Sequence, residues 1–166
     1  MPVQFTTSYL EDARAVLKQY KSLAEGAMAQ VSDADLFALL DGEANSIALI
    51  VKHMAGNMRS RWTDFLTSDG EKPDRNRDSE FVEPPATREA LMRIWDDGWR
   101  LVWAAIDPLT EADLGRTVYI RSEAHSVMQA IHRQVAHYAS HTGQIILLAK
   151  HYRGAEWKSL SIPKKK

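Results

Sequence analysis

Residues 122–152 read SEAHSVMQAIHRQVAHYASHTGQIILLAKHY, and the fold that we expect is built around this stretch. It is predicted to form one long helix that opens near Ser122, with Glu123 in its first turn. The helix carries His137 and His141, and residues four apart lie one above the other on the same face of an α-helix. Two imidazoles at this spacing can point at one metal ion, and histidine is the commonest metal ligand.

The helix face that carries the two histidines is apolar and amide-bearing rather than charged. Along it lie Ala130, Gln134, Gln144, Ile145 and Leu148. An exposed face would more often show Lys, Glu or Arg, so we expect the histidines to face inward. Two interpretations stay open at this point. Inward histidines can simply be hydrogen-bonded to a neighbouring helix, or they can bind a metal together with a third histidine, for which His53 is the candidate.

The length and composition of the chain are those of an ordinary globular domain. We expect one domain over residues 1–166, long enough to bury a good core. Hydrophobic residues make up 45% and charged residues 26%, as is usual for soluble proteins. The net charge of −1 gives no reason to expect nucleic-acid or membrane partners. The three residues Lys164–Lys166 are expected to form a solvated tail.

Cysteine is absent from the sequence, which limits the chemistry that the chain can perform. Disulfides, thiolate catalysis and cysteine-based zinc sites are excluded. Any metal must be held by His, Asp, Glu or amide groups. The N-terminus lacks the features of a signal peptide, and no apolar run approaches the ~20 residues of a membrane span. We therefore expect a cytoplasmic protein.

Three further segments show helical periodicity, so the sequence predicts an all-α protein. Apolar residues recur at steps of three and four in residues 8–29, 42–66 and 88–105. Residues 31–40 are expected to connect the first two helices, and residues 117–120 to be briefly extended. Gly70 is expected to end the second helix in a left-handed conformation, and Thr87 to cap the third.

The segment between the second and third helices, residues 71–86, is long for a connection within a compact domain. Neighbouring helices that run parallel need a long crossover, whereas antiparallel neighbours need only a few residues. We therefore interpret the segment as a crossover. Because it is rich in charges of both signs, a lid over the site is the alternative.

The remaining histidines and the tryptophans suggest no second site. His125, His132 and His151 lie on other faces or near helix ends and are interpreted as surface or edge residues. The tryptophans are interpreted as core or dimer-contact anchors: Trp62, Trp95, Trp99, Trp103 and Trp157. The sequence contains no Gly-rich phosphate loop, no GxSxG elbow and no HExxH motif.

Three histidines from two helices would form an open divalent-metal site. Structural zinc sites generally use four ligands, whereas catalytic sites use three and keep a position for water or substrate. Three neutral ligands leave the +2 charge intact, so the ion would be a strong Lewis acid that lowers the pKa of bound water toward ~7. Asn57 and Gln144 each lie near one turn from a histidine and are candidates to orient a ligand or substrate. No acidic residue is placed by the sequence as a general base.

His53, the pair His137 and His141, and Gly143-Gln144 together resemble the pattern of the DinB-like superfamily, also called YfiT-type. That pattern has one His on the second helix and an HxxxH pair on the fourth, followed by Gly-Gln. Residues 52–66 and 69–75 look like one branch of the superfamily whose function is not assigned. The resemblance covers nearly the whole chain.

The resemblance implies a four-helix bundle with a long crossover between helices 2 and 3, and commonly a homodimer. It also implies a bound divalent metal, zinc or nickel, on the three histidines. Some members of the superfamily are bacillithiol transferases or mycothiol-dependent isomerases. The expected function is a metal-dependent thiol S-transferase or hydrolase acting on a small molecule, with a low-molecular-weight thiol as a candidate partner. The alternative is a non-catalytic homodimeric metal-binding or stress-associated binding protein.

Overall fold

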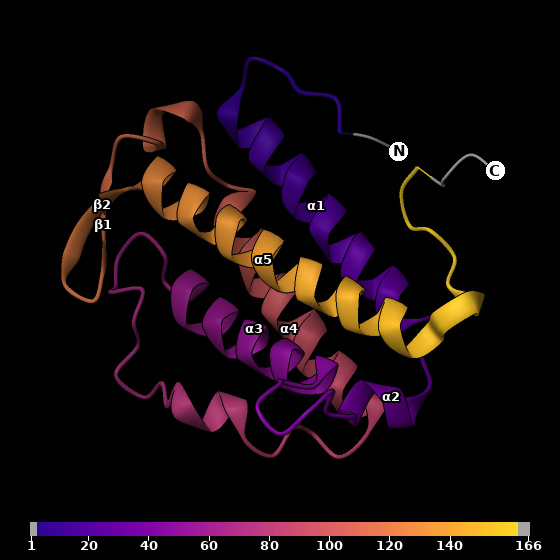
Figure 1. Ribbon diagram of the computed structural model, residues 1–166. Coiled ribbons are helices and arrows are strands. Elements are labelled where there is room, and N and C mark those ends of the chain that lie inside the picture. Colours follow the sequence, from indigo (N-terminus) through magenta and orange to yellow (C-terminus); the bar gives the residue numbers. More distant parts are fainter. Residues whose placement is uncertain (1–2, 163–166) are drawn as a thin grey trace.

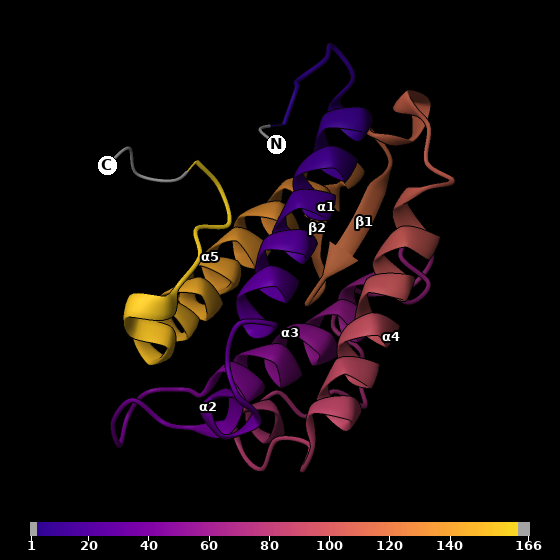
Figure 2. The same ribbon diagram turned by 90° about the vertical axis from the view of Figure 1, so that its right-hand side faces the viewer.

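The computed structural model describes residues 3–162, which form an all-α bundle with one small β-hairpin (Figures 1 and 2). The helices are α1 (Tyr9–Met28), α2 (Asp33–Phe37), α3 (Ile47–Trp62), α4 (Arg88–Ile106) and α5 (Val127–Arg153). The hairpin pairs β1 (Thr117–Ile120) with β2 (Glu123–Ser126). Short 3₁₀ turns are η1 (Asp78–Phe81), η2 (Glu111–Asp113) and η3 (Gly154–Glu156). The predicted tail Lys164–Lys166 lies outside the described residues.

The four long helices pack as two parallel pairs that run in opposite directions (Figures 1 and 2). Helices α1 and α5 lie side by side, and α3 and α4 lie side by side. Arg14 near the start of α1 donates to the carbonyl of Ile106 at the end of α4, 2.9 Å away. Residues 71–86 cross from the end of α3 to the start of α4, so the predicted crossover is confirmed. Within residues 3–162, no helix combines the length and apolar character that crossing a membrane requires.

Aromatic side chains fill the centre of the bundle. Trp95, Trp99 and Tyr138 are the largest of its fully buried side chains. The ring centroids of Trp99 lie 5.6 Å from Trp95 and 5.7 Å from Tyr138, both in edge-to-face geometry. Trp62 is also buried, whereas Trp103 and Trp157 pack against the core while partly exposed. The prediction that the tryptophans anchor the core is therefore confirmed for most of them.

Helix α3 is shorter than the predicted segment 42–66 at both ends. It begins after Ser46, whose side chain caps it by accepting from the Leu49 amide at 3.1 Å. After Trp62 the chain turns through Asp64, which has a positive φ of 49°. The prediction that Gly70 supplies the left-handed residue is therefore wrong.

Gly70 instead allows a close approach of two backbones. Its amide donates to the Tyr119 carbonyl at 2.7 Å. A Cβ atom at this position would lie 3.2 Å from Ile120 Cγ1 and 3.4 Å from that same carbonyl oxygen. The absence of a side chain lets the residues after α3 dock on the hairpin.

Helix α5 begins at Val127, five residues later than predicted, because residues 123–126 form β2. Ser126 is the N-cap, and its side chain accepts from the Gln129 amide at 3.1 Å. In return, the Gln129 side chain accepts from the Ser126 amide at 2.8 Å. This reciprocal capping box is a start signal that outweighs the one at Ser122.

Asp69 holds the tip of the hairpin. Arg121 and Ser122 form its turn, with φ of 55° and 64°, values that residues other than glycine adopt at a cost. Asp69 accepts from the Arg121 amide at 2.9 Å and from the Ser122 amide at 2.7 Å. Burial opposes the charge of Asp69, but the amide hydrogen bonds outweigh it and hold the pKa of Asp69 below its ordinary value.

We predict that Asp69→Asn destabilises the protein at pH 7 and flattens the acid side of its stability profile. A carboxyl whose pKa is lowered by folding stabilises the folded state above its unfolded pKa of about 4 and loses this contribution as the pH falls below it. Chemical denaturation between pH 3 and 7 measures the profile. Exposed Asp96→Asn, on α4, is the control, and an unchanged slope in Asp69→Asn would contradict the role of Asp69.

Two helical glycines should respond to alanine with opposite signs. A Cβ at Gly98 in α4 would lie 2.9 Å from Met58 Sδ and 3.4 Å from the Ala55 Cα, whereas Gly143 in α5 has no atom that close. Gly98→Ala should lower the free energy of unfolding by about 1–3 kcal/mol through overpacking. Gly143→Ala should raise it by about 0.5–1 kcal/mol through helix propensity. Equal effects in urea unfolding would show that α3 and α4 do not approach this closely.

Candidate metal centre

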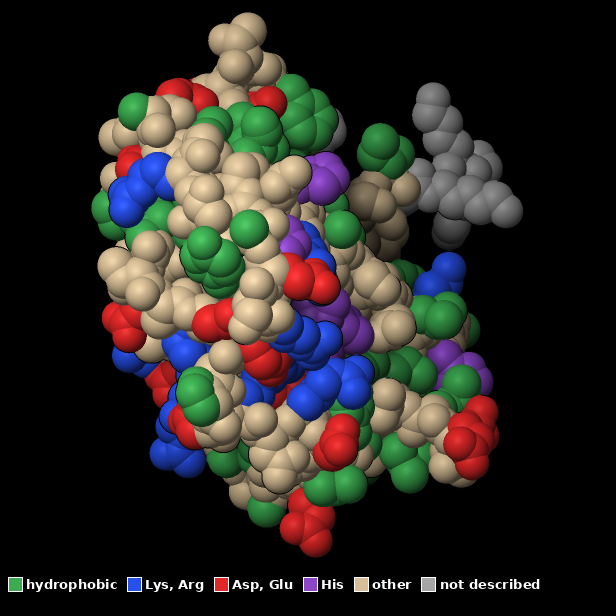
Figure 3. All heavy atoms as spheres, turned by 90° about the vertical axis from the view of Figure 1, so that its left-hand side faces the viewer, with side chains coloured by type: hydrophobic (Ala, Val, Ile, Leu, Met, Phe, Trp, Pro, Cys, Tyr) green, Lys and Arg blue, Asp and Glu red, His purple; other side chains and the backbone are tan. Residues whose placement is uncertain are grey.

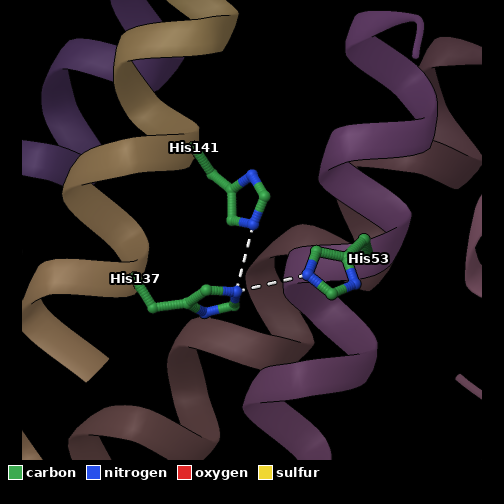
Figure 4. Close-up of side chains that lie close together, drawn as sticks. All are labelled: His53, His137 and His141. Atoms are coloured by element: carbon green, nitrogen blue, oxygen red, sulfur yellow. Dashed lines mark hydrogen bonds between the residues drawn. The ribbon is translucent and has the colours of Figure 1, made fainter. Parts of the chain in front are cut away.

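The structure brings the three predicted histidines together between α3 and α5 (Figure 4). His53 projects from α3 and is 4% exposed, while His137 and His141 project from α5 and are half-buried. The Nε2 atom of His137 lies 3.3 Å from that of His53 and 3.0 Å from that of His141. One potential ligand atom from each ring falls within 4.8 Å of the other two. The three rings therefore offer a single point that one ion could occupy.

A buried hydrogen-bond chain sets the rotation of α5 relative to α3. The hydroxyl of Tyr138, next to His137, accepts from Trp62 Nε1 at 2.8 Å and donates to Asn57 Oδ1 at 3.2 Å. Tyr138 is fully buried, so this geometry is enforced by packing as well as by hydrogen bonds. Asn57 lies one turn along α3 from His53 and was a candidate to orient a ligand or substrate. Its side chain instead accepts the hydrogen bond from Tyr138 and holds that ring in place.

Two of the three rings are oriented by hydrogen bonds on their outer nitrogens. His53 Nδ1 donates to Glu80 Oε2 at 2.8 Å, because a carboxylate can only accept. His141 Nδ1 lies 2.8 Å from Gln144 Oε1, also an acceptor, as the candidate role of Gln144 predicts. With Nδ1 protonated, the Nε2 lone pair of each neutral ring faces the centre. This is the tautomer that a metal ligand needs.

The spacing of the Nε2 atoms fits a small divalent cation. Metal–nitrogen bonds of about 2.0–2.1 Å in tetrahedral geometry place ligand nitrogens about 3.3 Å apart. Without a cation, His137 Nε2 can donate its one proton to either His53 or His141, and the Nε2 lone pair of the other ring is left without a donor. His137 Nδ1 is buried and has no hydrogen-bond partner among the residues that the structure covers. A cation at the centre would satisfy all three Nε2 atoms at once.

The surroundings keep the rings of α5 neutral. Burial, reinforced by the neighbouring His141 and His53, lowers the pKa of His137 to about 3. Burial also lowers the pKa of His141, and the nearby His53 lowers it further, whereas its hydrogen bond to Gln144 acts in the opposite direction. A ligating imidazole must be unprotonated, so these environments favour the binding form at neutral pH.

The crossover supplies a carboxylate that the sequence did not identify. Glu80 in η1 is 5% exposed and lies between His53 and Arg75. Arg75 donates to it through Nε at 2.8 Å and through Nη2 at 2.9 Å. Burial opposes the charge of Glu80, but the hydrogen bonds from His53 and Arg75 prevail and hold its pKa below the ordinary value. Glu80 is therefore an anion that orients His53.

Gly56 makes room for this carboxylate. It lies in the middle of α3, where glycine is unfavourable, and a Cβ there would come within 2.7 Å of Glu80 Cδ. An unexplained glycine inside a predicted helix, followed by a charged crossover, is the signal that could have pointed to Glu80. Ring stacking of Phe81 on His53, with centroids 4.6 Å apart, adds a second contact from the crossover. Residues 78–81 thus form one wall of the site.

The other histidines lie outside the cluster. His125 Nδ1 bonds to the carbonyl of Glu123 within the hairpin at 2.9 Å. His132 and His151 are exposed on α5. Their interpretation as surface or edge residues is confirmed.

Fold and site together define an all-α bundle with a three-histidine cluster that could hold a metal ion, braced by a carboxylate from the crossover. The sequence model of one protein family matches residues 4–166. The chain belongs to this family, which is described as "Protein of unknown function (DUF1572)". Among curated proteins, no match to the chain is found.

We predict that Glu80→Gln weakens binding of a divalent metal by about 10-fold or more, because partners that orient a ligating histidine typically contribute 10- to 100-fold in affinity. Competition with a chromophoric chelator measures the affinity. Glu89→Gln, an exposed change on α4, is the matched control. Circular dichroism must show that both variants stay folded. Equal affinity of Glu80→Gln and Glu89→Gln would mean that Glu80 only stabilises the fold.

Proposed function

We propose that this protein is a metal-dependent enzyme in which His53, His137 and His141 hold one divalent cation, zinc or nickel, and that it acts on a small molecule. The observation that supports this proposal is the convergence of three Nε2 atoms, with 3.0 and 3.3 Å between neighbours. Three neutral nitrogen ligands are the set used by open, catalytic divalent sites. When bound, the ion would supply Lewis-acid chemistry at the remaining position.

The carboxylate beside the cluster is not free to act as a general base, which a metal-bound thiol would not need. A hydrolase benefits from a carboxylate or histidine free to take a proton from water. Glu80 is the buried carboxylate beside His53, and its oxygens are already engaged by His53 and Arg75. A thiol that coordinates a cation is deprotonated without a protein base. We therefore propose a low-molecular-weight thiol as cosubstrate, with hydrolysis as the second reaction to test.

The resemblance to the DinB-like superfamily supports the proposed thiol cosubstrate, since members of that superfamily include thiol-dependent transferases. The three histidines, the following Gly143-Gln144 and the crossover between α3 and α4 carry the resemblance. We extend the proposal to a homodimer, which the resemblance implies, and to a cytoplasmic location, which the sequence led us to expect.

Purified protein is expected to contain one divalent ion per chain, and His137→Ala is expected to lose it. Removal of one of three ligands leaves too few nitrogens for tight binding. Elemental analysis after gel filtration measures the stoichiometry. His132→Ala is the matched control, because it removes an exposed histidine from the same helix. Native protein that holds no metal and takes up none from zinc or nickel solutions would contradict the proposal.

The reaction class is tested on the metal-loaded protein with two panels, one of thiols paired with electrophilic acceptors and one of esters and amides. Turnover of the first panel alone supports thiol transfer, and turnover of the second alone supports a hydrolase. If the fully loaded protein turns over neither panel, the non-catalytic homodimeric or stress-associated binding protein becomes the better description.

A further inference from the structure

Arg77 lies near the histidine cluster, and its positive charge is not neutralised by any ion pair of the described residues. It is exposed, and it forms no ion pair within residues 3–162. Its guanidinium carbon lies 5.1 Å from the centroid of the Phe81 ring. Phe81 in turn stacks on His53. A cation–π contact of this kind restrains a long side chain without neutralising it.

The stack Arg77–Phe81–His53 limits how far this charge can lie from the histidine cluster. The guanidinium can be no farther from the His53 ring than the two stacking distances together, 5.1 and 4.6 Å. Arg77 is also the residue that precedes η1, whose carboxylate orients His53. The same short turn therefore carries both this positive group and the carboxylate that positions one of the imidazoles.

Behind the cluster, three arginine side chains gather around two carboxylates. Arg61, Arg75 and Arg121 all contact the carboxylate of Glu71, at 3.0, 3.2 and 3.0 Å. Glu80 is the second carboxylate of this network, so three guanidinium groups share two carboxylates. On the face that carries the crossover and the hairpin, histidine side chains reach the surface beside Lys, Arg, Asp and Glu side chains (Figure 3). A bound cation on neutral imidazoles would add further positive charge.

We infer that the substrate of this site is an anion, and that Arg77 binds its carboxylate, sulfonate or phosphate group while the rest of the molecule reaches the metal. This inference rests on the proposed metal-dependent function and adds the charge of the substrate to it. An arginine fork matches planar or tetrahedral oxyanions in a way that a lysine does not.

The test compares two thiols of equal length on cobalt-loaded protein. The probes are 2-mercaptoethanesulfonate and 2-mercaptoethanol, which differ in the sulfonate or hydroxyl at the far end, and a sulfonate is a weak metal ligand. Thiolate binding to cobalt is followed by its charge-transfer absorption. Wild-type protein is expected to bind the sulfonate more tightly. Arg77→Gln is expected to lose about three- to tenfold of that affinity, as for a partly exposed charge-assisted hydrogen bond, with 2-mercaptoethanol unaffected.

Two variants distinguish hydrogen bonding by the planar guanidinium group of Arg77 from a general effect of positive charge. Arg93→Gln removes an exposed arginine of α4 and should leave both affinities unchanged. Arg77→Lys keeps the charge and should recover only part of the sulfonate affinity. The same sulfonate preference in wild type and Arg77→Gln would overturn the inference while leaving the metal site intact. Failure to bind cobalt, or failure of both thiols to reach it, would overturn the proposed function and this inference with it.

Discussion

The hydrogen bond from the Trp62 indole to the Tyr138 hydroxyl is the interaction on which the rest of the site depends. This hydrogen bond joins α3 to α5 in the buried core, where water does not compete for the two groups. The Tyr138 hydroxyl in turn donates to Asn57 of α3. A polar group left unpaired in such a place would cost about 1–3 kcal/mol, so the two helices have one favoured rotation. In that rotation, residues 137 and 141 of α5 face residue 53 of α3.

The second requirement of the site is electrostatic. Three imidazoles with facing lone pairs do not attract one another, and the surrounding protein must hold them in place. Packing against Phe81 and the hydrogen bond to Glu80 do this for His53, and Gln144 does it for His141. Glu80 is kept as an anion by Arg75, whose side chain is only 5% exposed. Burial of this pair is tolerable because each partner satisfies the other.

Helical periodicity was sufficient to predict the four long helices. The i,i+4 histidine pair predicted that both rings face inward, but it left open whether they only form hydrogen bonds or bind a metal. His53 was named as the candidate third histidine, but helical periodicity alone does not show that it meets the pair. The start of α5 was misjudged because the capping box of Ser126 and Gln129 was overlooked, and the strand pairing of residues 123–126 excludes a start at Ser122. Glu80 was missed because its role comes from how the crossover folds back over Gly56, and the glycine in the predicted helix was the one local sign of that approach.

The distribution of the site along the chain has a consequence for biosynthesis. His53 meets a carboxylate 27 residues downstream and an imidazole 84 residues downstream. Contacts between such distant positions form late, since closing long loops carries an entropic cost that local helices do not. A ribosome must release most of α5 before any ion can be captured by all three rings. Any cation that all three rings bind would thus be acquired only after residue 141 has left the ribosome, and its supply need not keep pace with translation.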